Sequence, residues 1–281
     1  MKPLFHGLVE TLVRLTSGLA IALSAASLVA PAQAMTIDKK LVVTVRTVCN
    51  DDGIDCSFQG PAGNLFYETV GDKIWAQAGI DLEFVLGLNV NSTELLTGPV
   101  AGLSAFTGAT AGTGTTMYLT SSLHCVGCVL FGEAWLGAGG LVINMDAVAS
   151  FNSGIGRLDT IAHELGHNLG LYTGVGAVGG HDNGNTHFLI ASGGVRLIPS
   201  ALGDICPHPS AASCLDYLKP EHISVARASS LLVAIPEPAT LLMAVFGLVV
   251  VGTAAQRRLN TTSQTPWPSL MPRFSNLVSG R

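Results

Sequence analysis

The sequence is short of charged residues. Only 12% of its 281 residues are Asp, Glu, Lys or Arg, whereas soluble domains usually carry about 25%. Part of the chain is therefore not ordinary soluble-domain sequence. The 14 Lys and Arg residues do not outnumber the 19 Asp and Glu residues, so there is no basic surplus to neutralise phosphates, which argues against a nucleic-acid partner. Apolar residues make up 48% of the chain, which argues against intrinsic disorder.

The N-terminal segment is almost free of charge, and its features follow the order typical of an export signal. Lys2 and Arg14 precede an apolar run over residues 15–30, and a small-residue site ends at Ala34. The run is short for a membrane span, which needs about 20 residues. We therefore predict that residues 1–34 are a secretory signal peptide that is cleaved after Ala34, rather than an uncleaved membrane anchor.

A second charge-free stretch lies near the C-terminus. The tripeptide Pro-Glu-Pro at 236–238 precedes an apolar segment over 239–255, and two arginines follow at 257–258. This order resembles the PEP-CTERM sorting signal. The resemblance implies that residues 235–258 include a short transmembrane helix and are handled by an exosortase-type sorting enzyme, and the arginines predict that the protein body is exported to the cell envelope or beyond. We expect residues 259–281 to form an unstructured tail.

All six cysteines lie between these two signals, as expected for an exported chain with disulfides. Their proximity along the sequence favours the pairs Cys49–Cys56, Cys125–Cys128 and Cys206–Cys214. The pair Cys125 and Cys128 has two alternatives, a thiol-disulfide redox motif or a metal site with His124. No second Cys-x-x-Cys pair exists to complete four zinc ligands, so we favour a structural disulfide.

Residues 35–232 remain as the protein body, which is long enough for one well-buried domain. Its β-branched and alternating segments predict strands, and its amphipathic segments predict helices. A Gly-rich connection over 97–116 has little periodicity. The order of these elements predicts an α+β domain. The predicted strands are 41–46, 80–85, 117–119, 129–131 and 141–145, and the predicted helices are 64–78, one from about Arg157, and a short one from Lys219.

The helix after Arg157 contains the pattern His-Glu-x-x-His, which is the zinc-binding pentapeptide of metalloproteases. On a helix, His163 and His167 lie about 40° apart, so both imidazoles face one side. Glu164 lies beside them, where it can accept a proton from water without binding the metal. The opposite side of this helix carries the apolar residues Leu158, Ile161, Leu165 and Leu169.

A catalytic zinc site normally needs a third protein ligand. A downstream glutamate is one option, but no Glu occurs between Asn168 and Pro220, and Glu221 lacks a helical partner motif. A histidine after a Gly-induced turn is the other option. Here Gly170 stands where such a turn would end the helix, so we favour a histidine from the segment that follows.

With Gly170, the sequence resembles the metzincin pattern H-E-x-x-H-x-x-G-x-x-H. Thr173 stands where that pattern has its third histidine, and a glycine-rich insertion follows it. We predict that the insertion moves the ligand to His181, with His187 as the competing candidate. The dipeptide formed by His181 and Asp182 is similar to the closing motif of reprolysin-like metzincins, and Asp182 is a candidate support for the metal ligands.

The resemblance to metzincins implies a domain with a mixed, mostly parallel twisted sheet, an active-site helix and a loop-rich C-terminal part. It also implies Zn²⁺ as the cofactor, Glu164 as the general base, and endopeptidase activity on a peptide or protein substrate. Ile190 stands where metzincins have the methionine of their Met-turn, and preserves an apolar floor. By analogy, the strand Leu141–Met145 would be the sheet edge along which a substrate peptide lies.

Two other functions compete with this prediction. The first is a zinc-stabilised but catalytically silent protein of the cell surface or extracellular matrix, which Thr173 and Ile190 favour because both depart from the pattern. The second is a thiol-disulfide oxidoreductase that uses Cys125 and Cys128 and needs no metal.

Overall fold

The structure is a computed structural model, and it describes residues 35–97, 106, 113–123, 127, 129–172, 180–208 and 213–236. The chain divides into two compact units, residues 1–235 and 236–281, and nearly all described residues belong to the first. The predicted signal peptide, the predicted tail and most of the predicted sorting signal lie outside the described residues. No helix among the described residues is long and apolar enough to cross a bilayer, and the span predicted at 239–255 falls outside them.

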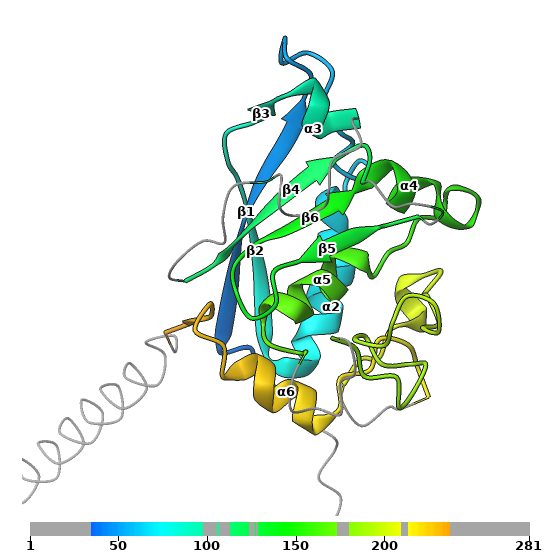
Figure 1. The fold of residues 1–281 in the computed structure, drawn as a ribbon. Helices are drawn as coiled ribbons and strands as arrows, with labels where there is room; N and C mark the ends of the chain where they lie inside the picture. Colours follow the sequence, from blue (N-terminus) through cyan, green and yellow to red (C-terminus); the bar gives the residue numbers. More distant parts are fainter. Residues whose placement is uncertain are drawn as a thin grey trace, which may run out of the picture. The chain divides into compact units, whose positions relative to one another are not determined.

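A mixed, mostly parallel twisted sheet forms the centre of the first unit (Figure 1). Its main path runs in the order β2-β1-β4-β6-β5. The first four strands of this path are mutually parallel, and β5 is antiparallel to β6. This arrangement confirms the fold expected from the sequence. The strands are β1 (Lys39–Cys49), β2 (Ile80–Leu86), β3 (Val90–Asn91), β4 (Thr115–Thr120), β5 (Gly132–Ala134), β6 (Leu141–Asn144) and β7 (Val233–Ala234).

Two strand predictions were wrong. The residues 129–131 are not in a strand; β5 begins one residue later, at Gly132. The strand at 141–144 is not the sheet edge, because β6 lies between β4 and β5. All four β6 residues are buried, as expected for a strand with neighbours on both sides. The edge on this side of the sheet is β5, which pairs only with β6 among the described strands.

The helix predicted over 64–78 is interrupted. It consists of the 3₁₀ turn η1 (Leu65–Tyr67), the α-helix α2 (Glu68–Trp75) and the 3₁₀ turn η2 (Ala76–Ala78). Phe66 and Tyr67 have positive φ angles of 56° and 52°, which a continuous right-handed helix does not allow. The remaining helices are α3 (Thr93–Thr97), α4 (Met145–Gly154), which the sequence analysis missed, α5 (Thr160–Asn168), η4 (Leu202–Asp204) and α6 (Pro220–Arg227).

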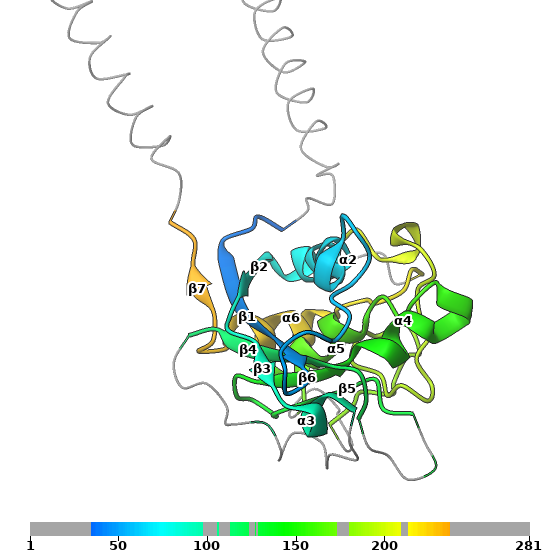
Figure 2. The same cartoon turned by 90° about the horizontal axis from the view of Figure 1, so that it is seen from above.

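The main core lies between one face of the sheet and the helices α2 and α5 (Figure 2). Alternate residues of β1, such as Leu41 and Val43, point into this core. From the helices, Ile74, Trp75 and Leu165 meet them and are fully buried. A smaller cluster that includes Val48, Tyr118 and Val142 packs on the other face with α3. We call residues 39–172, as far as the structure describes them, the sheet region.

The segment that follows, residues 180–208 and 213–218, has little regular structure, and we call it the loop region. Apart from η4, its regular structure consists of isolated bridges, among them Phe188 with Tyr217 and Ile205 with Leu215. The Cys206–Cys214 disulfide closes it, and Cys49–Cys56 closes a turn after β1, so two of the predicted pairs are confirmed. Cys125 and Cys128 lie outside the described residues. The helix predicted from Lys219 is also confirmed, since α6 begins at Pro220.

Candidate metal centre

Helix α5 carries the histidine motif through the middle of the protein body. It begins three residues later than predicted from Arg157, and all nine of its residues are buried. Ile161 and Leu165 face the core as predicted, but His163 and His167 are only 5% exposed. Their shared side of the helix is therefore not open to solvent, because the loop region covers it. Gly170 then ends the helix with a positive φ of 97°, as predicted.

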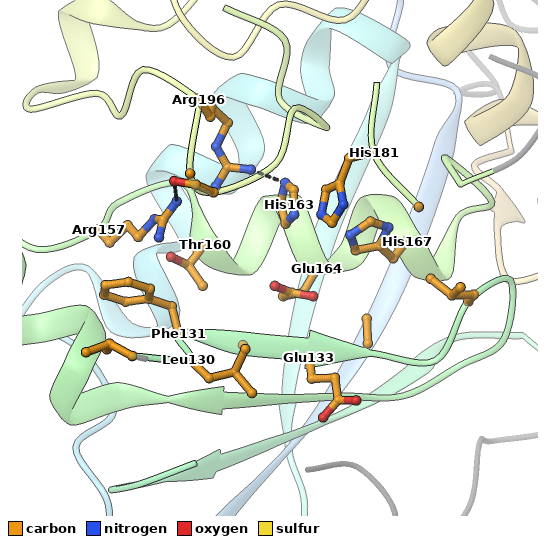
Figure 3. Close-up of a pocket in the computed structure, with 17 residues that line it drawn as sticks. Leu130, Phe131, Glu133, Arg157, Thr160, His163, Glu164, His167, His181 and Arg196 are labelled. Atoms are coloured by element: carbon orange, nitrogen blue, oxygen red, sulfur yellow. Dashed lines mark hydrogen bonds between the residues drawn. The ribbon is translucent and has the colours of Figure 1, made fainter. Parts of the chain in front are cut away.

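Three histidines meet on the covered side of α5 (Figure 3). One nitrogen atom of each of His163, His167 and His181 lies within 4.8 Å of the other two. The ring centroids of His163 and His181 are 5.3 Å apart, and that of His167 is 4.8 and 5.0 Å from them. The structure thus brings together the three residues that the sequence analysis proposed as ligands, two from a helix and one from a loop.

The competing histidine lies elsewhere. His187 is not part of the cluster, and its Nδ1 lies 3.1 Å from the carbonyl oxygen of Cys214, within the loop region. Asp182, the predicted support, holds the segment next to His181. Its Oδ2 is 2.5 Å from Nζ of Lys219 and 3.1 Å from Nε2 of His222. Asp182 therefore connects the His181 segment to the start of α6.

The orientation of His163 is set by a backbone carbonyl. Its Nδ1 lies 2.7 Å from the Leu189 oxygen, and the Nη1 of Arg196 lies against the same ring nitrogen. Nη1 carries two hydrogens, and the carbonyls of Leu189 and Ala191, at 2.7 and 3.2 Å, accept both. Nδ1 therefore keeps its own proton for Leu189, which leaves the Nε2 lone pair available for a metal.

Arg196 belongs to a buried cluster of charges beneath His163. Its Nε lies 2.9 Å from Oδ2 of Asp159, and the two side chains are 2% and 0% exposed. Asp216 is also fully buried, and burial together with the neighbouring Asp159 raises the pKa of Asp216 well above its usual range. Asp159 is the carboxylate that pairs with Arg196. This pair ties the start of α5 to the loop region.

Glu164 lies between the histidine cluster and strand β5 (Figure 3). A Cβ atom at Gly132 would come within 2.8 Å of Cγ of Glu164, so only glycine allows this close approach. Burial raises the pKa of Glu164 to about 8, against the opposing effect of Arg196. A cation in the adjacent histidine cluster would favour the ionised carboxylate.

The electrostatics of the cluster fit a metal ion. Burial lowers the pKa of His163 well below its usual value, and the charge of Arg196 lowers it further. Burial and then His181 lower the pKa of His167 to about 4. Both rings are therefore neutral at pH 7, as metal ligands must be. Three neutral imidazoles are the ligand set of one class of catalytic zinc sites.

A cavity of about 640 Å³ contains these groups. It runs between β5, the histidine-bearing side of α5 and the loop region, and Arg157, Thr160 and Arg196 line one end of it. Beneath the histidines, Ile190 is fully buried, and its Cδ1 packs against Gly166. The apolar floor expected at Ile190 is thus present. Thr173 lies outside the described residues.

The sequence analysis missed the polar residues that support this site. It gave no role to Arg196, Asp159 or Asn168. Asn168 is 1% exposed, and its Nδ2 donates to the carbonyls of Trp135 and Gly140 at 2.9 and 2.8 Å. Asn168 thus ties the end of α5 to the β5–β6 connection. The low content of charged residues could have pointed to Arg196 and Asp159, because in a chain this apolar each charged residue is a candidate for a specific ion pair.

Comparison with known proteins identifies the C-terminal signal. Residues 234–258 match the PEP-CTERM protein-sorting motif, which agrees with the segment predicted at 235–258. No curated protein matches the chain.

Solved structures similar to this one include zinc-peptidase and metalloproteinase structures of low sequence identity. Archaemetzincin from Archaeoglobus fulgidus, complexed with malonate, is 13% identical, with 66% of this chain and 99% of that chain covered and a TM-score of 0.37. Archaemetzincin from Methanopyrus kandleri is 13% identical, with 72% and 98% covered and a TM-score of 0.41. Metalloproteinase-II from Bacteroides fragilis is 14% identical, with 70% and 54% covered and a TM-score of 0.40.

Proposed function

We propose that this protein is an exported zinc-dependent endopeptidase. The observation that carries the proposal is the position of Glu164, a buried carboxyl group beside three clustered histidines, in a cavity bordered by a strand at the sheet edge. The match of residues 234–258 to a sorting motif supports export. An exosortase-type enzyme is the partner proposed for that segment, with residues 1–34 as the signal peptide and 35–232 as the enzyme domain.

We assign His163, His167 and His181 as the zinc ligands. When bound, zinc supplies Lewis acidity, which acidifies water and polarises a carbonyl group. The carbonyl of Leu189 keeps His163 in the tautomer that presents Nε2. The contacts of Asp182 with Lys219 and His222 hold the loop that carries His181.

Glu164 acts as the general base in this proposal. In its ionised form it accepts a proton from the attacking water, and it then delivers that proton to the amine nitrogen that leaves. The burial of Glu164 favours its role as a temporary proton carrier. Its raised pKa indicates that the protonated carboxyl group is stable in the cavity until the proton passes to the amine. The glycine at 132 keeps the space in front of the carboxyl group open.

The substrate peptide lies along β5 rather than β6. Strand addition to an exposed edge supplies main-chain hydrogen bonds with little dependence on the side chains. Phe131, at the start of β5, contacts Arg157 before α5, and Gly137 beyond its end donates to the carbonyl of His167 at 2.9 Å. Strand and helix therefore run in the same direction, and a peptide on β5 passes the whole histidine cluster.

The substitution Glu164→Gln tests the proposal. We expect the zinc-loaded variant to retain one zinc per chain and to lose activity on casein or a peptide library by about 10²–10⁴-fold. Glu221→Gln is the matched control, because Glu221 is exposed on α6 and was the competing glutamate ligand. Zinc content, measured by atomic absorption, separates loss of the base from loss of the metal.

Two results would contradict the proposal. A parent protein that binds zinc but cleaves no peptide would instead be the catalytically silent surface protein. A Glu164→Gln variant that cleaves as fast as the parent would exclude Glu164 as the base.

A further inference from the structure

One buried cation in the cavity, Arg157, forms no ion pair with a carboxylate in the described part of the chain. Arg157 is 7% exposed and lines the cavity at the end away from His167. Its Nε is buried and has no hydrogen-bond partner in the described part of the chain. The one acceptor that its guanidinium has there is the Gly193 carbonyl, at 3.4 Å from Nη2. The carboxyl groups of Asp159, Glu164 and Asp216 favour its charge from a distance, but none pairs with it directly, and a buried charge that is not directly paired is costly. This arginine is therefore suited to an anion that enters the cavity.

The neighbours of Arg157 direct its guanidinium toward the cavity and, among the described residues, leave its Nε without a partner. The guanidinium carbon stacks over the Phe131 ring, 4.4 Å from its centroid, which holds the plane of the group and leaves its N–H edge available. Asp159, the residue just before α5, forms its ion pair with Arg196. Its carboxylate is therefore already engaged and does not pair with Arg157.

A second donor lies beside Arg157. Thr160 Oγ1 is buried, lines the same cavity and has no hydrogen-bond partner in the part of the chain that the structure describes. Thr160 and Glu164 are four residues apart on α5, so they lie on one side of the helix and about 6 Å apart along its axis. The two unpartnered groups therefore lie one turn before the proposed general base, on the side of the cavity bordered by Gly193 and Gly194.

The direction of a bound peptide decides which substrate residue meets these donors. Antiparallel strand pairs outnumber parallel ones, and an antiparallel peptide on β5 would run from the His167 end toward the Phe131 end. Residues after the scissile bond then lie beside Arg157. Resting on the function proposed above, we propose that the enzyme selects an acidic side chain, Glu or Asp, directly after the scissile bond, with Arg157 and Thr160 binding its carboxylate.

The test uses the full chain, loaded with zinc, and pairs of peptides that differ only by Glu or Gln at the position after the cleaved bond. We expect the parent to prefer the Glu peptide by at least about tenfold in kcat/KM, because a charge-assisted pair is stronger than a neutral one. The preference should fall to near unity in Arg157→Gln and be partly kept in Arg157→Lys. Arg46→Gln is the control, because Arg46 lies on β1 over Tyr118 and outside the cavity.

Binding of the same peptides to the Glu164→Gln variant, measured by calorimetry, keeps this inference separate from the proposed function. If no peptide is cleaved but the Glu peptide still binds at least tenfold more tightly, the protease proposal fails and the acidic subsite stands. If the parent cleaves or binds Glu and Gln peptides equally, the acidic subsite is wrong, whatever the activity. A preference that survives in a folded Arg157→Gln variant would also overturn it.

Discussion

In the sheet region, α2 and α5 pack against the strands through apolar side chains. The loop region adds Leu189, Ile190 and Leu218 to the same core, but it is also held by a buried ion pair and a disulfide. His163 and His167 belong to the first region and His181 to the second. The proposed metal site therefore joins two parts with different sources of stability. Apolar packing tolerates small changes of shape, but a buried ion pair loses stability sharply when one partner is removed. The loop region is thus the more easily disturbed side of the site.

The largest effect is expected from the buried pair of Arg196 and Asp159. Arg196→Met leaves Asp159 buried and unpaired, and we expect the free energy of unfolding to fall by about 3–5 kcal/mol. Arg46→Met is the matched change in the sheet region, and it should cost less than about 1 kcal/mol, because Arg46 is only partly buried. Urea unfolding of both variants measures the difference. Equal losses would show that the two regions are stabilised alike.

The two disulfides provide a closer comparison. They enclose nearly equal loops, with sequence separations of 7 for Cys49–Cys56 and 8 for Cys206–Cys214. Chain entropy alone predicts a loss of about 2.5 kcal/mol for removing either pair by substitution to Ala. We expect only the loss of Cys206–Cys214 to weaken zinc binding as well, because it loosens the region that carries His181. Zinc titration against a competing chelator checks this, and a similar weakening from both variants would remove the distinction.

The smallest effect concerns a carboxyl group in the sheet region, Asp72 on α2. Burial raises its pKa from 3.8 to about 6, although the Leu82 amide donates to it at 3.3 Å. A folded-state pKa above the unfolded value means that the folded chain holds the proton more tightly. This contribution to stability is full below about pH 4 and is lost as the pH rises through about 6.

Asp72→Asn removes this penalty while it keeps an oxygen acceptor for Leu82. We expect a gain of about 1 kcal/mol at pH 7, after allowance for solvent screening, and no gain at pH 4. Unfolding curves at both pH values test the sign. A variant that is less stable than the parent at pH 7 would show that the carboxylate is favourable at this position.

The sequence predicted the parts of the fold that depend on local periodicity. The β-branched composition of 41–46 and the alternation in 80–85 indicated β1 and β2, and the spacing of Ile161, Leu165 and Leu169 indicated the core side of α5. The same logic could not distinguish an edge strand from a central one. Strand order is decided by tertiary pairing, and a short buried run such as 141–144 has the same composition in either place.

The sequence predicted those site residues that lie within a recognisable motif. The spacing of His163, Glu164 and His167 indicated their shared helix, and the structure brings His181 to them. The roles of Arg196 and Asp159 were invisible, because 37 positions separate them along the chain and their pairing exists only after folding. Residues that meet across such separations carry no local pattern.

The short strand β7 has a practical consequence for engineering this protein. Val233 and Ala234 pair with Lys40 and Lys39 at the start of β1, and the amide of Ile235 donates to the carbonyl of Asp38 at 2.8 Å. The folded body therefore begins and ends at adjacent points on its surface. A short linker could join these two points and new termini could be opened in an exposed turn, so circular permutants of the body should keep the histidine cluster intact.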